Sequence, residues 1–291
     1  MIGMLWNLII LNPMINALLI IYSGVNWVYL LALIGAFGIA IILFTLLVRL
    51  ITHPLTVQQL KGTQKMQEFQ RSEEWQAIQK KYKDDKQKLQ QEQMKMYKEM
   101  GINPLGSCLP TLIQFPIIIG LYQAISRVMA VTPLQMVSMY DHVYPFVNVS
   151  KLLPVDNTFL WMNLSQPERV YIMGYGIPVL AIIVVATTYI QSKLMAPPTQ
   201  QGDQGAQMAQ AMNLYMPLFM GYLALTFPSG LSLYFITSNV ASILQYGAMG
   251  KLNWKNIIPG RKAVPQLPPE STTKPKPAAK TTTKERSKKS T

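Results

Sequence analysis

Arg49 is the residue whose chemistry most needs a structural explanation. It is the first charged residue of the chain, and all 48 residues before it are uncharged. A guanidinium keeps its proton, so an arginine in an apolar helix must reach the lipid headgroups or find polar partners inside a helix bundle. The apolar stretches of the chain contain no Asp or Glu that could pair with it. Inside a bundle, Arg49 would therefore be placed to receive a negative charge from another molecule.

Other polar side chains recur at helical spacing within the apolar stretches. Thr45, Arg49 and Thr52 lie at positions i, i+4 and i+7, which places them on one face of a helix. Similar stripes occur in three further stretches: Ser107, Thr111 and Gln114; Thr187 and Gln191; and Ser238, Ser242 and Gln245. Such groups often serve as hydrogen-bond partners between helices. Four stripes together with an arginine could instead line a wet cavity.

Residues for common catalytic and metal sites do not occur in suitable patterns. The two histidines, His53 and His142, have no metal-ligand spacing, and His53 precedes Pro54, where we expect a helix to end. The single cysteine, Cys108, excludes an intramolecular disulfide and a thiolate cluster. We find no phosphate-binding glycine loop and no nucleophile elbow. The sequence therefore predicts a protein that is not an enzyme, with no catalytic residue, metal site or cofactor.

The composition indicates a membrane protein that carries these polar stripes on helices. Half of the residues are hydrophobic, yet the net charge is +13, which fits an integral membrane protein with basic water-exposed parts. Crossing about 30 Å of hydrocarbon takes roughly 20 apolar residues. Such stretches lie at 28–51, 108–131, 171–194, 211–227 and 231–249. The predicted fold class is an all-α integral membrane protein with five transmembrane helices.

The distribution of charge predicts how the chain is oriented. Residues 53–104 hold ten basic side chains and residues 251–291 hold eleven, so both should be cytoplasmic. An N-terminus on the outside then requires an odd number of spans. The apolar segment 5–22 is interrupted by three asparagines and Pro13, which suits a helix in the membrane interface better than a sixth span. The predicted regions are an extracytoplasmic segment 1–27, a first span 28–52, a cytoplasmic part 53–104, spans two to five within 105–250 with an outside loop 132–170, and a tail 251–291.

The two cytoplasmic regions have different compositions. Residues 53–104 are rich in helix-forming residues, and Asp84-Asp85 predicts a turn and an N-cap that fold them into a helical hairpin. Its apolar residues are too sparse for a buried core, so the hairpin is either a solvated, ion-paired structure or a mobile docking arm. Residues 251–291 carry a net charge of +9 with repeated Pro, Thr and Lys. We expect a disordered tail that suits anionic lipid or ribosomal RNA.

Four segments of the chain resemble known sequences, in the same order. They are VRLITHPLTVQQLKGTQKMQ at 48–67, NPLGSCLPTLIQFPIIIGLY at 103–122, FLWMNLSQPE at 159–168 and FPSGLSLYFITSNVASILQ at 227–245. Together they resemble the YidC/Oxa1/Alb3 family of membrane protein insertases, over about residues 5–250. The short N-terminus resembles members without a large extracytoplasmic domain.

The resemblance implies a five-helix core with a hydrophilic groove, open to the cytoplasm and the lipid and closed on the outside. Hydropathy alone favours Arg49 as an anchor near the cytoplasmic end of its helix, whereas the resemblance places it inside the groove. Gln191 resembles a polar groove residue of the third span, and Phe235 stands where relatives often carry a tryptophan. The predicted groove residues are Arg49, Thr45, Gln114, Gln191, Phe235 and Ser238.

The predicted function is that of an insertase, which moves nascent hydrophobic segments from the cytoplasm into the bilayer of a bacterial plasma membrane. Its expected partners are nascent membrane proteins, the lipid bilayer, ribosome or signal recognition particle components at the basic tail, and the Sec translocon. Two alternatives stay open from the residues alone. One is a small-solute transporter or channel with Arg49 as an anion site, and the other is an assembly scaffold that binds clients without inserting them.

Overall fold

The computed structural model describes residues 2–82, 85–101, 109–129, 133–195, 204–250 and 252. These residues are mainly helical. The helices are α1 (Ile2–Trp6), the π-helical η1 (Asn7–Leu11), α2 (Asn12–Asn26), α3 (Tyr29–Arg71), α4 (Glu73–Lys81), α5 (Lys86–Glu99), α6 (Leu109–Val128), α7 (Pro133–Tyr140), the 3-10 turn η3 (Val149–Lys151), α8 (Val179–Met195), α9 (Gln204–Thr226) and α10 (Ser229–Ala248). Two antiparallel hairpins pair β1 (Thr158–Phe159) with β2 (Met162–Asn163) and β3 (Val170–Ile172) with β4 (Tyr175–Ile177).

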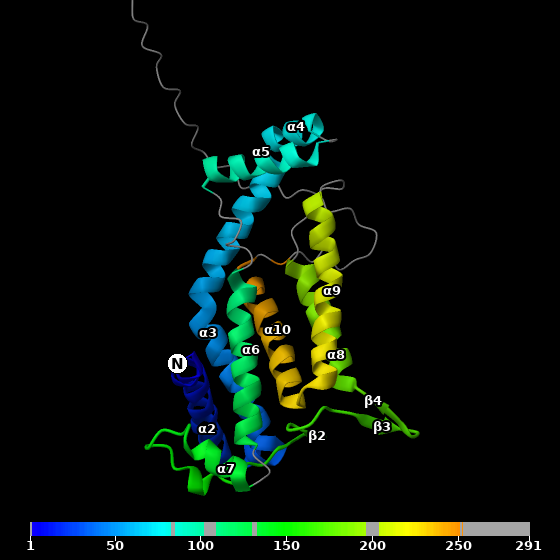
Figure 1. The fold of residues 1–291 in the computed structure, drawn as a ribbon. Coiled ribbons are helices and arrows are strands. Elements are labelled where there is room, and N and C mark those ends of the chain that lie inside the picture. The colour runs from blue at the N-terminus through cyan, green and yellow to red at the C-terminus, as the bar shows by residue number, and fades with distance from the viewer. Residues whose placement is uncertain are drawn as a thin grey trace, which may run out of the picture.

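The long helices α3, α6, α8, α9 and α10 form a bundle (Figure 1). Helices α4 and α5 lie beyond one end of this bundle, which we term the α4–α5 end. Helix α7 and both β-hairpins lie at the opposite end, which we term the strand end. The segment that follows α3 therefore lies at the α4–α5 end, and the segments between α6 and α8 lie at the strand end.

Two helices of the described residues are long and apolar enough to cross a membrane. They are Gly3–Asn26 and Tyr29–Gly62, and shorter apolar helices span Val179–Met195 and Leu214–Thr226. The predicted count of five spans is thus neither confirmed nor contradicted. The predicted start of the third span at residue 171 is wrong, because residues 170–177 form the β3–β4 hairpin. Helix α8 begins only after Pro178, whose fixed φ suits a helix start.

Helix α3 continues past the point where we expected it to end. Pro54 lies inside the helix, so the prediction of a helix end at His53 is wrong. Proline removes one backbone N–H, but the neighbouring threonines remain hydrogen-bonded within the helix: Thr52 Oγ1 donates to Val48 O at 2.8 Å and Thr56 Oγ1 to Thr52 O at 3.1 Å. The helix ends at Ser72, whose Oγ accepts from the Trp75 backbone N–H at 3.3 Å and so caps α4.

The segment after Ser72 contains two short helices, α4 and α5. Asp85 is the N-cap of α5, and its carboxylate accepts from the Lys88 backbone N–H at 3.1 Å. This bond is the main cause that lowers the pKa of the Asp85 carboxyl. Asp84 lies outside the described residues.

The expectation that this segment has no buried core is wrong. Phe69, Trp75, Met96 and Tyr97 are all buried against one another. The Phe69 ring centroid lies 5.1 Å from that of Trp75 and 4.8 Å from that of Tyr97. These four residues are sparse along the sequence. They meet because the end of α3 and helices α4 and α5 pack their apolar faces against one another.

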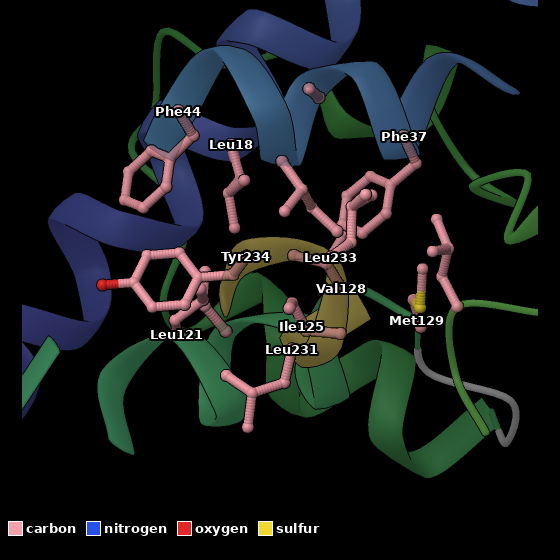
Figure 2. Packing of buried hydrophobic residues seen from close by; sticks show 14 of the residues in the cluster. Leu18, Phe37, Phe44, Leu121, Ile125, Val128, Met129, Leu231, Leu233 and Tyr234 are labelled. Atoms are coloured by element: carbon pink, nitrogen blue, oxygen red, sulfur yellow. The ribbon is translucent and has the colours of Figure 1, made fainter. Parts of the chain in front are cut away.

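The main hydrophobic core lies between α2, α3, α6 and α10. Figure 2 shows part of it, with Leu18 from α2, Phe37 and Phe44 from α3, Leu121, Ile125, Val128 and Met129 from α6 or just after it, and Leu231, Leu233 and Tyr234 from α10. These residues come from segments far apart in the sequence, so the core joins the N-terminal helix to the last helix of the bundle.

The N-terminal helix packs closely against α6. A Cβ added at Gly120 would meet Ile10 at 2.6 Å and Met14 at 2.7 Å, so this glycine is the point of closest approach. Trp6 Nε1 donates to Gln123 Oε1 at 2.9 Å.

At the strand end, the β1–β2 hairpin packs into a break in α3. Gly35 has a φ of +119°, and a Cβ there would lie 2.4 Å from Thr158 O. The Leu160 backbone N–H donates to Ile34 O at 3.1 Å, and the ring of Phe159 fills the space beside Gly38. Glycine permits both the positive φ and this close approach.

The same connector also binds the starts of α10 and α8. The backbone N–H of Ser229 donates to Gln166 O at 2.9 Å and that of Gly230 to Leu164 O at 3.1 Å. Glu168 Oε2 accepts from the Leu180 backbone N–H in the first turn of α8 at 3.0 Å. The connector 157–168 therefore ties α3, α8 and α10 together at the strand end.

Candidate functional site

The site is built around the side chain of Arg49, which reaches from α3 to α10. Its Nε donates to Ser238 Oγ at 3.1 Å, and its Nη2 donates to the same oxygen. Both side chains come from polar stripes found in the sequence, and the structure brings them together. The guanidinium is thus held by a neutral hydroxyl on another helix. This contact favours a position of Arg49 inside the helix bundle over a role as an anchor in the lipid headgroups.

A second contact joins α3 and α10 about two helical turns further along α10. Gln245 Nε2 donates to the backbone oxygen of Arg49 at 3.1 Å. Gln245 Oε1 is buried and has no hydrogen-bond partner among the described residues. Ser242, between the two contacts, donates instead to the Ser238 backbone oxygen of its own helix at 2.8 Å. The two end residues of this stripe, Ser238 and Gln245, thus bond to Arg49 of α3. The middle residue, Ser242, bonds within α10.

The third helix of the site is α6. Gln114 Nε2 donates to the hydroxyl of Tyr234, which is buried and lies one turn before Ser238 on α10. Phe235, the next residue, is also buried, with its ring centroid 5.8 Å from that of Tyr234. We call Arg49, Gln114, Tyr234, Ser238 and Gln245 the Arg49 cluster. It joins α3, α6 and α10.

Two predicted groove residues do not join this cluster by a hydrogen bond. Thr45 is fully buried, and its Oγ1 donates to Ile41 O of its own helix at 2.7 Å. Gln191 is half-buried on α8, and among the described residues it forms no side-chain hydrogen bond with the cluster. Of the second stripe, Ser107 lies outside the described residues, as does Cys108, and nothing is described of the Thr111 side chain.

Sequence reasoning missed Asn239, which joins α10 to α8. This nearly buried side chain donates through Nδ2 to Thr188 Oγ1 at 2.8 Å and to Thr187 Oγ1 at 3.1 Å. An asparagine in an otherwise apolar helix is a signal for an interhelical hydrogen bond. Tyr234 was missed as well, because a tyrosine in such a helix looks like ordinary packing.

A second polar cluster fastens α2 to the loop after α7. Asn16 Nδ2 donates to Asn12 O at 2.7 Å and to His142 O at 2.9 Å, and its Oδ1 accepts from the Tyr144 backbone N–H at 2.8 Å. His142 Nδ1 lies 2.8 Å from Asn12 Oδ1. Burial lowers the pKa of His142, and the Arg127 guanidinium lowers it further. These asparagines, which the sequence showed only as interruptions, bind another segment.

Within the described part of the chain, the Arg49 cluster is a cation without a carboxylate counter-ion. Among the described residues, no carboxylate forms an ion pair with Arg49, and the ion pair found there is Lys88–Asp85. A search of the same residues for three or more grouped His, Cys, Asp or Glu finds no candidate metal site. Nε and Nη2 of Arg49 both donate to the Ser238 hydroxyl. A guanidinium has five N–H groups, so its other N–H groups can donate to an anionic or carbonyl group of another molecule.

Comparison with known proteins points in one direction. The family described as 60Kd inner membrane protein matches residues 29–255. The membrane protein insertase YidC of Clostridium perfringens is 38% identical over 244 residues, which cover 81% of this chain and 89% of that protein. The YidC of Clostridium tetani is 37% identical and covers 76% and 84%. The chloroplastic inner membrane protein ALBINO3 of Arabidopsis thaliana is 34% identical, with 75% of this chain and 47% of that protein covered.

A solved structure is also similar to this chain. It is a crystal structure of an active YidC insertase with the first transmembrane domain resolved, with 28% sequence identity and a TM-score of 0.46. The match covers 78% of this chain and 45% of the other, so this chain spans under half of that protein's length.

Proposed function

Because the chain belongs to the YidC/Oxa1/Alb3 family of membrane protein insertases, we propose that it inserts its clients through a polar step at the Arg49 cluster. The chain is a membrane protein insertase and acts on nascent membrane proteins in the bilayer. Insertases are not classical enzymes. An insertase must help a polar end of its client to cross the apolar layer while an apolar segment of the client enters that layer.

In the proposed mechanism, the client enters from the cytoplasm and its short acidic tail is attracted to Arg49. Moving a polar amide from water to an apolar medium costs roughly 2–7 kcal/mol, and an ionised carboxylate costs far more. A guanidinium about 4 Å from that carboxylate offsets ~4 kcal/mol at an effective dielectric constant of about 20. The client's apolar segment then leaves along α8 and α10 into lipid, where each buried Leu- or Phe-sized side chain contributes about 1.5–3 kcal/mol.

The single observation that carries this mechanism is the pairing of Arg49 with a neutral partner. Ser238 holds the guanidinium in place through hydrogen bonds but leaves its positive charge uncompensated. A carboxylate partner would have neutralised the site. Within the cluster Tyr234 and Ser238 are buried, as is the neighbouring Thr45. Gln114, Gln245 and Arg49 itself are only partly buried. This graded burial fits a polar surface that a client can reach from one side.

The proposed groove consists of Arg49, Thr45, Gln114, Gln191, Phe235 and Ser238, open to the cytoplasm and the lipid and closed outside. The bonds of the connector 157–168 to α3, α8 and α10 support closure at the strand end, which we assign to the outside. The α4–α5 end is then cytoplasmic, as its basic residues favour. The chain would be a multi-pass protein of a bacterial plasma membrane with five spans, an N-terminus outside and a C-terminus inside. We also propose an interfacial position for the segment 5–22, because its asparagines and Pro13 interrupt the apolar sequence.

The partners of the cytoplasmic parts belong to the same proposal. The tail 251–291 lies outside the described residues except Leu252, and its net charge of +9 suits contact with ribosome or signal recognition particle components. We propose that the Sec translocon joins for some clients. The alternative of a solute carrier is disfavoured, because the two clostridial relatives are named insertases.

The experiment is insertion of a single-span client with an acidic outside tail into liposomes that contain only this purified protein. Protease protection of the tail measures insertion. We expect Arg49→Ala to lose most of the protection and Arg49→Lys to retain it, because charge rather than the planar guanidinium attracts the tail. Equal insertion by all three proteins would exclude the charge mechanism while leaving the insertase assignment intact. Solute flux through the same liposomes would support the carrier instead.

A further inference from the structure

The β3–β4 hairpin exposes a group of apolar and aromatic side chains that the proposed mechanism does not use. Tyr171 is 73% exposed, Met173 95% and Tyr175 78%. Ile172 is exposed as well, while Val170 and Ile177 at the base are half-buried. Isolated two-stranded hairpins are marginally stable in water, and one with a surface this apolar requires a partner.

The hairpin has a regular two-residue turn with a methionine at its tip. Ile172 pairs with Tyr175 across the strands, and the intervening Met173 and Gly174 both have positive φ, 52° and 84°. Two such residues make the turn that matches the twist of a hairpin. The register puts Ile172 and Tyr175 on one face, and the Tyr171 ring packs over Gly176 on the other. The first face and the tip are therefore apolar, and the aliphatic part of Arg169 shares the second face with Tyr171.

The hairpin is continuous with the surface of α8, in sequence and in space. No charged residue lies between Arg169 and Lys193, so hydropathy alone makes the hairpin part of a span. Helix α8 begins two residues after β4, and its Ile182 is exposed on the outside of the bundle. Figure 1 shows the hairpin projecting obliquely to the side, just beyond the nearby ends of α8 and α9, instead of continuing along the helix axes.

We infer that the β3–β4 hairpin lies in the headgroup region of the outer leaflet and binds the lipid surface through Tyr171, Ile172, Met173 and Tyr175. Tyrosine suits that depth, because its ring is apolar and its hydroxyl reaches water or headgroups. Arg169, at the base of the hairpin, is placed to meet lipid phosphates. The inference rests on the proposed assignment of the strand end to the outside only for the choice of leaflet. The contact would fix the depth of the start of α8, which Glu168 caps from the neighbouring connector.

The test uses one environment-sensitive dye on a cysteine introduced as Met173→Cys, with Cys108→Ser removing the native thiol. The purified full chain is placed in liposomes of zwitterionic lipid, with iodide on both sides of the bilayer. We expect quenching by lipids that carry a nitroxide near the headgroup and at least threefold weaker quenching by iodide than for a matched probe at Ser150→Cys. Ser150 is exposed in the loop at the same end of the molecule.

Three results would overturn the inference. Equal iodide quenching at both positions would mean that the hairpin lies in water. Protection from iodide that vanishes at about one protein per liposome would assign the surface to a second copy of the chain. Protection that appears only when a client is added would make it a client site. Failure of Arg49→Ala to affect insertion would leave this inference untouched, since the dye reports depth and not activity.

Discussion

The guanidinium of Arg49 and the hydroxyl of Ser238 meet through two hydrogen bonds, although 189 residues separate them in the chain. The contact joins α3 to α10 without neutralising the charge. A structural ion pair would stabilise the bundle more simply, yet it would leave no net charge to attract a client. The neutral partner thus satisfies part of the hydrogen-bonding capacity of Arg49 and preserves its electrostatic attraction.

Removing the Ser238 hydroxyl separates the structural role of this contact from its charge. We expect Ser238→Ala to lower the free energy of unfolding by about 1.5–3 kcal/mol, the range for a hydrogen bond to a charged group. Insertion of an acidic-tailed client should persist, because the charge remains. Unfolding in detergent and protease protection measure the two effects. The matched control is Ser242→Ala, whose hydroxyl bonds only to its own helix and should cost under about 1 kcal/mol; equal losses would contradict the assignment.

Gly35 provides a test of the packing at the strand end. Its φ of +119° and a Cβ position 2.4 Å from Thr158 O leave no room for a side chain. Gly35→Ala should therefore lower the free energy of unfolding by about 2–5 kcal/mol, from backbone strain and overpacking. Gly24→Ala is the control: nothing lies within 4 Å of its Cβ position, and in a helix alanine should stabilise by roughly 0.5–1 kcal/mol. Thermal unfolding of both variants measures these changes. If Gly35→Ala lowers the free energy of unfolding by less than about 0.5 kcal/mol, the packing of the β1–β2 hairpin against Gly35 is contradicted.

The sequence predicted the helices that carry the site better than the bonds within it. Period-four stripes identified Arg49, Ser238 and Gln245, which meet between α3 and α10, and Gln114, whose partner Tyr234 was missed. Periodicity cannot tell them from Thr45, since a helical threonine can bond the carbonyl four residues earlier and this one does. Which residue of a stripe crosses to another helix depends on side-chain reach and helix rotation, and neither is contained in spacing.

The errors in the fold have a similar origin. Hydropathy assigned residues 171–178 to a span because it averages over a window, whereas Gly174 in the turn and Pro178 before the helix were the local signals of a hairpin. Phe69, Trp75 and Tyr97 looked too sparse to form a core because their contacts are not local. Only the angles between the end of α3, α4 and α5 bring them together.

His142 should make stability depend on pH. Burial and Arg127 lower its pKa in the folded protein, so the unfolded chain binds a proton more readily than the folded one. Its contribution to stability is present above the unfolded pKa of about 6.5 and is lost as the pH falls below that value. We expect the unfolding temperature in detergent to drop between about pH 7 and pH 5. His142→Gln should flatten that part of the profile, and an unchanged profile would show that other groups cause the drop.

Reversing the charge at Arg49 is the sharpest test of electrostatic attraction. Arg49→Glu should insert an acidic-tailed client less well than Arg49→Ala, because repulsion is added to the loss of attraction. The same variant should insert a client with a lysine tail better than the wild-type protein does. An interaction of ~4 kcal/mol allows changes of tenfold or more, which protease protection in liposomes resolves readily. Lys151→Glu makes the same change of net charge in η3, far along the chain from the cluster, and should alter neither client's insertion. If Arg49→Glu impairs both clients equally while the protein still unfolds at the wild-type temperature, Arg49 acts through its hydrogen bonds to Ser238 and not through its charge.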